Sequence, residues 1–180
     1  MKLNFLKEIE DLAIRVAGAS FRTEKDRNTD IIKKRFSLAG EDFYTLEEIG
    51  DYYDITRERV RQVEAKTVKN LQKVLSGDVL KGGFSASDAL ILEFEKIKQE
   101  VYEQDYILIE NDIVKNFCDK YCIESSSVTL KVVPLILEAL GYFKLPQKIS
   151  GYSGEIYDCW CLSEVFERKS IYRINLKMQA

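Results

Sequence analysis

Residues 45–75 read TLEEIGDYYDITRERVRQVEAKTVKNLQKVL, two amphipathic patterns with a short break between them. Thr45 can cap a first helix, and Glu48 three residues later completes a capping box. Asp54 marks the break, because Asp tolerates the left-handed conformation that a tight turn between helices often needs. Thr56 can then cap a second helix. The stretch therefore predicts two short helices joined by a tight turn.

The second predicted helix has one buried and one exposed side. Its buried side chains recur at helical spacing, and they are Val60, Val63, Thr67, Leu71 and Val74. The opposite side carries polar and basic residues near the start of the helix, namely Arg57, Glu58, Arg61 and Gln62. Two short helices, of which the second begins with such residues, are typical of a helix-turn-helix.

The same residues resemble region 4 of the primary sigma factors of bacterial RNA polymerase. The resemblance runs from about residue 27 to residue 75 and rests on RFSL at 35–38, TLEEIG at 45–50 and ITRERVRQVEAK at 55–66. It includes the exposed residues as well as the core, so it implies a helix-turn-helix that reads −35-like promoter DNA, with RNA polymerase core as a partner. Two positions depart from the family pattern of glycine, Ser37 in the turn after the preceding helix and Asp54.

By this resemblance, the exposed side of the second helix reads base edges. We expect Arg57 and Arg61 to donate to guanine or to phosphate. Glu58 is expected to accept from cytosine, and Gln62 to pair with adenine or guanine. A second set is expected to hold phosphates, partly through backbone N–H groups at the positive end of a helix. This set is Arg35, Thr45, Leu46, Arg59 and Lys66. The alternative is an ordinary solvated helix face, and for Lys66 both interpretations stay open.

Positive charge is concentrated in one segment of the chain, although the chain as a whole is slightly acidic. The 180 residues carry a net charge of −3, but residues 55–81 hold seven Lys and Arg against three Asp and Glu. Such a positive segment is the footprint expected of nucleic-acid binding. Residues 85–180 hold 11 Lys and Arg against 15 Asp and Glu, so this half is acidic.

Composition also limits the class of protein. The chain has no histidine, which removes the commonest proton-transfer residue and metal ligand, and it has no catalytic motif, so we expect no enzyme. No apolar run is long enough to span a membrane. Glu8, Glu10 and Asp11 do not suit a signal peptide, so we expect a cytoplasmic protein.

Periodicity and turn signals divide the chain into two predicted domains. Residues 3–17 predict an amphipathic helix ended by Gly18, and residues 23–36 predict a second helix. Residues 76–87, SGDVLKGGFSAS, are rich in Gly and Ser and predict a boundary between domain 1–80 and domain 85–180. The alternative is a loop inside a single domain.

The order of elements predicted for residues 85–180 is typical of a winged helix. A helix from about residue 88, a strand at 106–109 and a helix capped by Asp112 precede a third helix around Pro134. Strands at 142–145 and 156–162 then form a hairpin. The expected fold is mainly α, a sigma region 4-like helix-turn-helix domain followed by a winged-helix-like domain with a small β-hairpin.

The second predicted domain is expected to contact protein rather than DNA. Its acidic charge supplies little phosphate neutralisation, so a protein partner or a homodimer is favoured over a second DNA-reading unit. Its four cysteines could present four thiolates to zinc, but the spacing is unusual, and free thiols are the default inside cells. We expect no cofactor from Cys118, Cys122, Cys159 and Cys161.

Three functional classes follow from these observations. The protein is expected to be a transcription regulator that reads −35-like DNA. It could instead be the DNA-binding subunit of a split sigma factor, or an interaction protein of a phage or defence system that borrowed the fold. A complete sigma factor is not expected, because the chain has no counterpart of the regions that melt promoter DNA.

Overall fold

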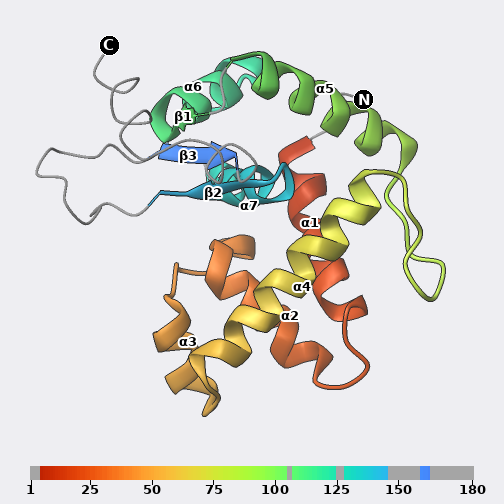
Figure 1. Cartoon of the computed structure of the whole chain (residues 1–180), viewed down its shortest axis with the longest axis vertical. Coiled ribbons are helices and arrows are strands. Elements are labelled where there is room, and N and C mark those ends of the chain that lie inside the picture. Colours follow the sequence, from red (N-terminus) through yellow and green to blue (C-terminus); the bar gives the residue numbers. More distant parts are fainter. Residues whose placement is uncertain (1–4, 105–106, 125–127, 146–158, 163–180) are drawn as a thin grey trace, which may run out of the picture.

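The computed structural model of the protein describes residues 5–104, 107–124, 128–145 and 159–162 (Figure 1). The first half is helical throughout. Its elements are α1 (Phe5–Ala19), α2 (Lys25–Phe36), the 3-10 helix η1 (Leu38–Gly40), α3 (Leu46–Tyr53) and α4 (Arg57–Leu75). The second half combines helices with a small sheet. Its elements are α5 (Asp88–Gln104), β1 (Ile107–Ile109), α6 (Glu110–Tyr121), η2 (Val128–Val132), α7 (Val133–Ala139), β2 (Tyr142–Lys144) and β3 (Cys159–Leu162).

Helices α3 and α4 form the predicted helix-turn-helix, with the predicted caps. The Glu48 amide donates to the Thr45 hydroxyl, and the Thr45 amide donates to the Glu48 carboxylate at 2.8 Å, which completes the capping box. Asp54 ends α3 with a left-handed backbone, φ 51°. The Thr56 hydroxyl accepts from the Arg59 amide at 3.1 Å and caps α4.

The buried stripe of α4 is also confirmed. The five predicted residues are all inaccessible to solvent, and α4 packs through them against α1 and α2 in the core. In α2, the three side chains predicted to face inward are buried as well, namely Ile31, Ile32 and Phe36. Burial of such apolar side chains is the main favourable term that holds these helices together.

The predicted end of the first helix needs correction. Gly18 does not end α1, because the helical backbone continues and the Ser20 amide donates to the Val16 carbonyl at 2.9 Å. Gly18 instead lies where α1 meets α2, and a Cβ there would come within 3.3 Å of the Thr29 hydroxyl. The second helix, Lys25–Phe36, lies within the range of about 23–36 that the sequence predicts.

The second half follows the predicted order of helix, strand, helix, helix and hairpin. Its sheet is antiparallel with the strand order β1-β3-β2, and Leu108 and Lys144 both pair with Trp160 in the register. Pro134 lies in the first turn of α7, where a missing N–H costs no helical hydrogen bond. The 3-10 helix η2 fills the residues before it, so the third helix starts late as expected.

One predicted cap in this half is wrong, and parts of other predictions lie outside the described residues. Asp112 does not cap α6, because β1 runs directly into the helix at Glu110 and leaves Asp112 in its first turn. The predicted strand positions 106 and 156–158, the loop at 146–155 and the tail beyond 162 fall outside the described ranges.

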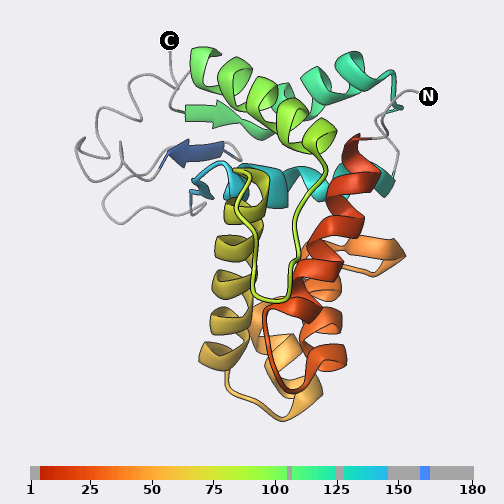
Figure 2. The ribbon, with the colours of Figure 1, turned by 90° about the vertical axis from the view of Figure 1, so that its right-hand side faces the viewer.

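The buried side chains of the two halves belong to one hydrophobic cluster. It runs from Phe5 in α1 to Trp160 in β3, and the rings of Phe5 and Tyr121 stack at 5.6 Å. The two views show α7 lying between the first-half helices and the helices α5 and α6 (Figures 1 and 2). The Gln72 side chain of α4 donates to the Glu138 carbonyl of α7 at 3.2 Å.

The segment between the halves is a folded loop. The Leu80 amide donates to the Phe84 carbonyl at 2.8 Å, so residues 80–84 turn back on themselves. The division into domains 1–80 and 85–180 stays a prediction. Among the described helices, none combines the length and the apolar composition needed to cross a bilayer.

Candidate nucleic-acid interface

The first two turns of α4 gather the four residues predicted to read bases. Helical spacing and the Thr56 cap place them together at the leading end of the helix, while the buried stripe faces the opposite way. All four side chains are exposed, namely Arg57, Glu58, Arg61 and Gln62. This end of α4 therefore presents a polar surface on a helix whose trailing end is fixed in the core.

An ion pair joins two of these residues in the absence of DNA. The Arg61 guanidinium donates to both carboxylate oxygens of Glu58, each at 2.7 Å. The hydrogen bond from Arg61 lowers the pKa of Glu58 and raises that of Arg61. The Gln62 amide also donates to Glu58, at 3.4 Å. A base edge that binds Arg61 must therefore share this arginine with Glu58 or replace that contact.

Arg57 links the two helices of the helix-turn-helix. Its guanidinium lies 2.8 Å from the Glu47 carboxylate of α3, and both side chains are mostly exposed. Arg59 lies at the side of the same surface, where its guanidinium is 3.9 Å from Glu24 and 3.5 Å from the Gln62 side-chain oxygen. Each of these exposed pairs is weak enough for a phosphate to displace.

The start of α3 holds the two residues predicted to bind phosphate through the backbone. Leu46 is the first helical residue, and Thr45 is the cap. The Thr45 amide is already bonded to Glu48, and that backbone hydrogen bond lowers the pKa of the Glu48 carboxyl. A phosphate at this helix end would compete with a carboxylate of the protein for the Thr45 amide.

Two predicted phosphate contacts lie away from the leading turns of α4. Arg35, at the end of α2, is half-buried, and its guanidinium is 2.9 Å from Glu64. Burial raises the pKa of Glu64, and Arg35 opposes this rise. The Lys66 ammonium lies 4.3 Å from the centre of the Phe21 ring, a cation–π contact on the side of α4.

The four cysteines are not brought together. Cys118 is half-buried on α6, and Cys122 is exposed at the left-handed end of that helix. Cys159 and Cys161 are buried in β3 beside Leu145. In the part of the chain that the structure describes, no group of three or more Cys, Asp or Glu side chains is placed to hold a metal ion.

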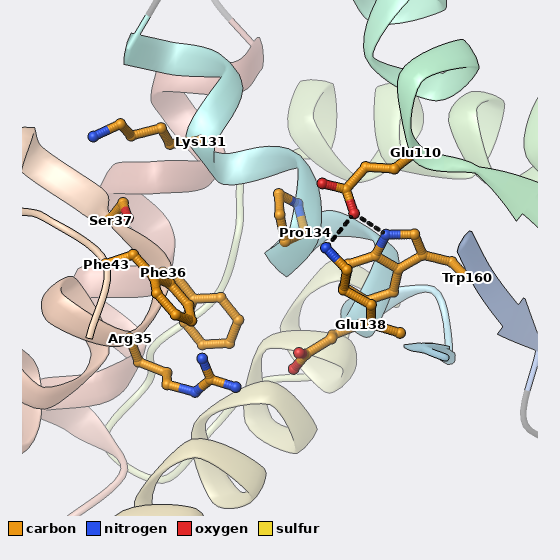
Figure 3. Close-up of a pocket in the computed structure, with 10 residues that line it drawn as sticks. Arg35, Phe36, Ser37, Phe43, Glu110, Lys131, Pro134, Glu138 and Trp160 are labelled. Atoms are coloured by element: carbon orange, nitrogen blue, oxygen red, sulfur yellow. Dashed lines mark hydrogen bonds and ion pairs between the residues drawn. The ribbon is translucent and has the colours of Figure 1, made fainter. Parts of the chain in front are cut away.

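Sequence reasoning missed a second polar site, which lies between the two halves. It is lined by residues of α2, α6, α7 and the sheet, among them Arg35, Glu138 and Trp160 (Figure 3). These residues are more than 20 positions apart in the sequence and share no motif, so only the packing of the two halves reveals them.

The comparisons with known proteins agree on the segment that forms α2, α3 and α4. Residues 25–73 match the family model for Sigma-70, region 4. The RNA polymerase sigma factor SigA of Lactococcus lactis subsp. cremoris is 42% identical over 50 residues, which cover 28% of this chain and 14% of that protein. RpoD of Neisseria gonorrhoeae is 35% identical over 63 residues, 35% of this chain and 10% of that protein.

SigA of a Nostoc species is 42% identical over 55 residues, 31% of this chain and 14% of that protein. The matched segment therefore spans about a seventh or less of the length of these curated relatives. No solved structure gives a significant match. Residues 25–73 of this chain thus match sigma region 4, a helix-turn-helix domain, and this segment holds α2, α3 and most of α4.

Proposed function

We propose that the protein is a sequence-specific, double-stranded DNA-binding transcription regulator that reads −35-like promoter DNA. The observation that carries this proposal is the exposed leading end of α4, on a segment that matches sigma region 4. An α-helix fits the major groove, where each base pair presents a distinct pattern of donors and acceptors. Arg57 and Arg61 would donate to guanine or phosphate, Glu58 would accept from cytosine, and Gln62 would pair with adenine or guanine.

The phosphate contacts in this proposal are of two kinds. On α4, Arg59 is half-buried and Lys66 is exposed, and both can turn from their present contacts toward a DNA strand. Thr45 and Leu46 would offer backbone N–H groups at the start of α3. Arg35 is half-buried and already pairs with Glu64, so a phosphate would have to displace that contact. Such contacts position the helix, whereas base contacts give specificity.

The second half would contact protein rather than DNA. In a winged helix the third helix commonly enters the groove, and here α7 holds that place in the chain. Three consecutive residues of α7 are fully buried, namely Leu135, Ile136 and Leu137. The acidic charge of residues 85–180 supports the same assignment, with a homodimer or another protein as the partner.

RNA polymerase core is a further proposed partner. We also propose that the protein is not an enzyme. A cytoplasmic location goes with this function, because the promoter DNA lies there. The two other candidates are the DNA-binding subunit of a split sigma factor and a phage or defence accessory. Co-purification with polymerase core would exclude the accessory. Promoter opening that requires a second small subunit would identify the split factor.

Single substitutions on α4 test the proposed reading surface. Arg61→Ala and Gln62→Ala should each cost about 1–3 kcal/mol on the best site and relax the preference at particular base pairs. Lys66→Ala should instead weaken binding to all sequences equally and lower the salt dependence. Fluorescence anisotropy with selected and random duplexes measures both effects. If Arg61→Ala and Lys66→Ala have the same effect on the two duplexes, the assigned surface is wrong.

A further inference from the structure

A pocket of about 370 Å³ lies between the two halves of the molecule. One wall comes from the end of α2 and the loop after it, and the other from α6, α7 and the sheet (Figure 3). Phe36, Phe43, Pro134 and Trp160 supply apolar surface. A volume of this size and an accessible surface that is mostly apolar are typical of sites for small organic molecules, and six polar or charged side chains also line this pocket.

Most charged groups of the pocket already have partners. The Glu110 carboxylate accepts from the Trp160 indole N–H at 2.9 Å and pairs with the Lys144 ammonium at 2.8 Å. Arg35 pairs with Glu64 at 2.9 Å. These pairs fix the walls of the pocket and leave little free charge on them.

Glu138 is the exception. Among the described residues, no hydrogen bond or ion pair is found for its carboxyl group, although Arg35 and Glu64 act on it through space. Its side chain points into the pocket, toward the guanidinium of Arg35 (Figure 3). Burial raises the pKa of Glu138 to about 8, the nearby charge of Glu64 adds to this rise, and Arg35 opposes it.

We propose that this pocket binds a small organic amine, whose ammonium group donates to the Glu138 carboxylate and whose apolar body packs against Phe36, Pro134 and Trp160. The charged groups of the pocket favour a cationic ligand over an anionic one. Arg35 and Lys144 are paired with carboxylates, whereas among the described residues no hydrogen bond or ion pair is found for the Glu138 carboxyl. Lys131 is exposed at the rim, and its ammonium points away from Glu138 (Figure 3).

The proposed binding also predicts a specific pH dependence of the affinity, because Glu138 must lose a proton when the amine binds. Glu64 on α4 and Arg35 on α2 act on the Glu138 carboxyl, and the other charged groups that line the pocket are Glu110 on α6, Lys131 on η2 and Lys144 on β2. Near pH 7 the empty site holds Glu138 mostly protonated, since its pKa is about 8. An ammonium ligand favours the ionised carboxylate, so binding near pH 7 releases a proton. The apparent affinity should therefore rise by up to about tenfold per pH unit below pH 8 and then level off.

Titration calorimetry of the full chain with 2-phenylethylamine tests this proposal. We expect saturable binding below about 10 mM, a weak affinity appropriate to so small a ligand, with one site per chain and release of a proton near pH 7. 3-Phenylpropionate, which has an anionic group on the same apolar body, should not bind. Repeating the titration in buffers with different ionisation enthalpies measures the released proton directly and needs no variant.

Glu138→Gln keeps the size of the side chain and removes its charge. It should weaken 2-phenylethylamine binding at least about tenfold and abolish the pH dependence. Glu103→Gln, at an exposed position of α5, is the matched control and should bind as the unaltered protein does. The proposal is overturned by no saturable binding, by binding without proton release, by equal affinity in Glu138→Gln, or by tighter binding of 3-phenylpropionate.

Discussion

Gly50 sets the geometry of the turn between α3 and α4. The Ile55 amide donates to the Gly50 carbonyl at 3.0 Å, which brings the chain after the turn against the last turn of α3. A Cβ at position 50 would lie 2.8 Å from the Ile55 carbonyl oxygen, a backbone atom that cannot move alone. The side chain at this position must therefore be hydrogen for the two helices to keep their angle.

Gly50→Ala is expected to destabilise the protein by about 1–3 kcal/mol, the usual cost of forcing a methyl group into a packed site. It should also weaken DNA binding, since α3 and α4 must move apart. Urea denaturation followed by circular dichroism measures the loss. Asp51→Ala, at the exposed neighbouring position of the same helix, should change stability by less than about 0.5 kcal/mol. Equal stabilities of the two variants would mean that the close approach does not exist.

Some left-handed residues could be predicted from the sequence and others could not. Asp54 was predictable, because a residue that tolerates positive φ stands between two amphipathic patterns. Ser37 has φ 52° where sigma region 4 usually has glycine, so the departure falls on a position that favours glycine. Ala39 and Cys122 also have positive φ, and nothing in their side-chain chemistry signals it; Cys122 follows the last turn of α6, where its amide donates to the Cys118 carbonyl.

At the scale of the element, α4 presents arginines that are already neutralised. Arg61 is held by Glu58, and Arg57 by Glu47, so the DNA-free surface carries paired charges rather than a bare positive patch. Phosphate and base edges must compete with these two carboxylates. In the proposed function, this arrangement would lower the affinity for random DNA more than for a site that offers Glu58 a cytosine amino group.

Glu58→Gln should therefore have two opposite effects. Binding to random DNA should tighten, because a negative charge is lost and Arg61 is freed, and the salt slope should steepen by up to about one. Discrimination at one cytosine should fall by about 1–3 kcal/mol. Glu47→Gln is the control, because it frees Arg57 without removing a predicted base contact. Anisotropy across a salt series checks both variants, and unchanged discrimination in Glu58→Gln would show that Glu58 reads no base.

Caps and apolar stripes made the elements predictable where the signal is local. Thr45, Glu48 and Thr56 act within one helical turn, so their spacing alone specifies the caps. Gly18 and Asp112 gave the wrong helix ends, because an interhelical contact and a direct strand-to-helix junction override the local preference. The pairing of Arg35 with Glu64 and the pocket around Glu138 depend on tertiary packing, which no spacing along the chain encodes.

At the scale of the whole molecule, the two halves share one apolar core. Trp160 is the only tryptophan in the chain and is buried in the second half, in the pocket whose other wall comes from α2, so its fluorescence reports on the second half and on its contact with the first. Far-UV circular dichroism reports on the helices of both halves. The two signals can therefore distinguish one cooperative unit from two independent domains.

We expect thermal unfolding of the full chain to give the same midpoint by tryptophan fluorescence and by circular dichroism. The reason is that separating the halves would expose apolar surface that the shared cluster now buries. Two dichroism transitions, of which only one coincides with the fluorescence change, would instead support independent domains at 1–80 and 85–180.

The inward position of α7 has a consequence for the symmetry of the DNA site. In the proposed function, each chain would offer one outward reading helix among the described residues, α4, since the corresponding helix of the second half, α7, is mostly buried within the molecule. One bound copy would then recognise a DNA sequence that is not palindromic. A palindromic site matches a protein dimer with a two-fold axis, and a single copy has no such axis. If mapped binding sites contain inverted repeats spaced by one helical turn of DNA, two copies of the protein must bind together at each site.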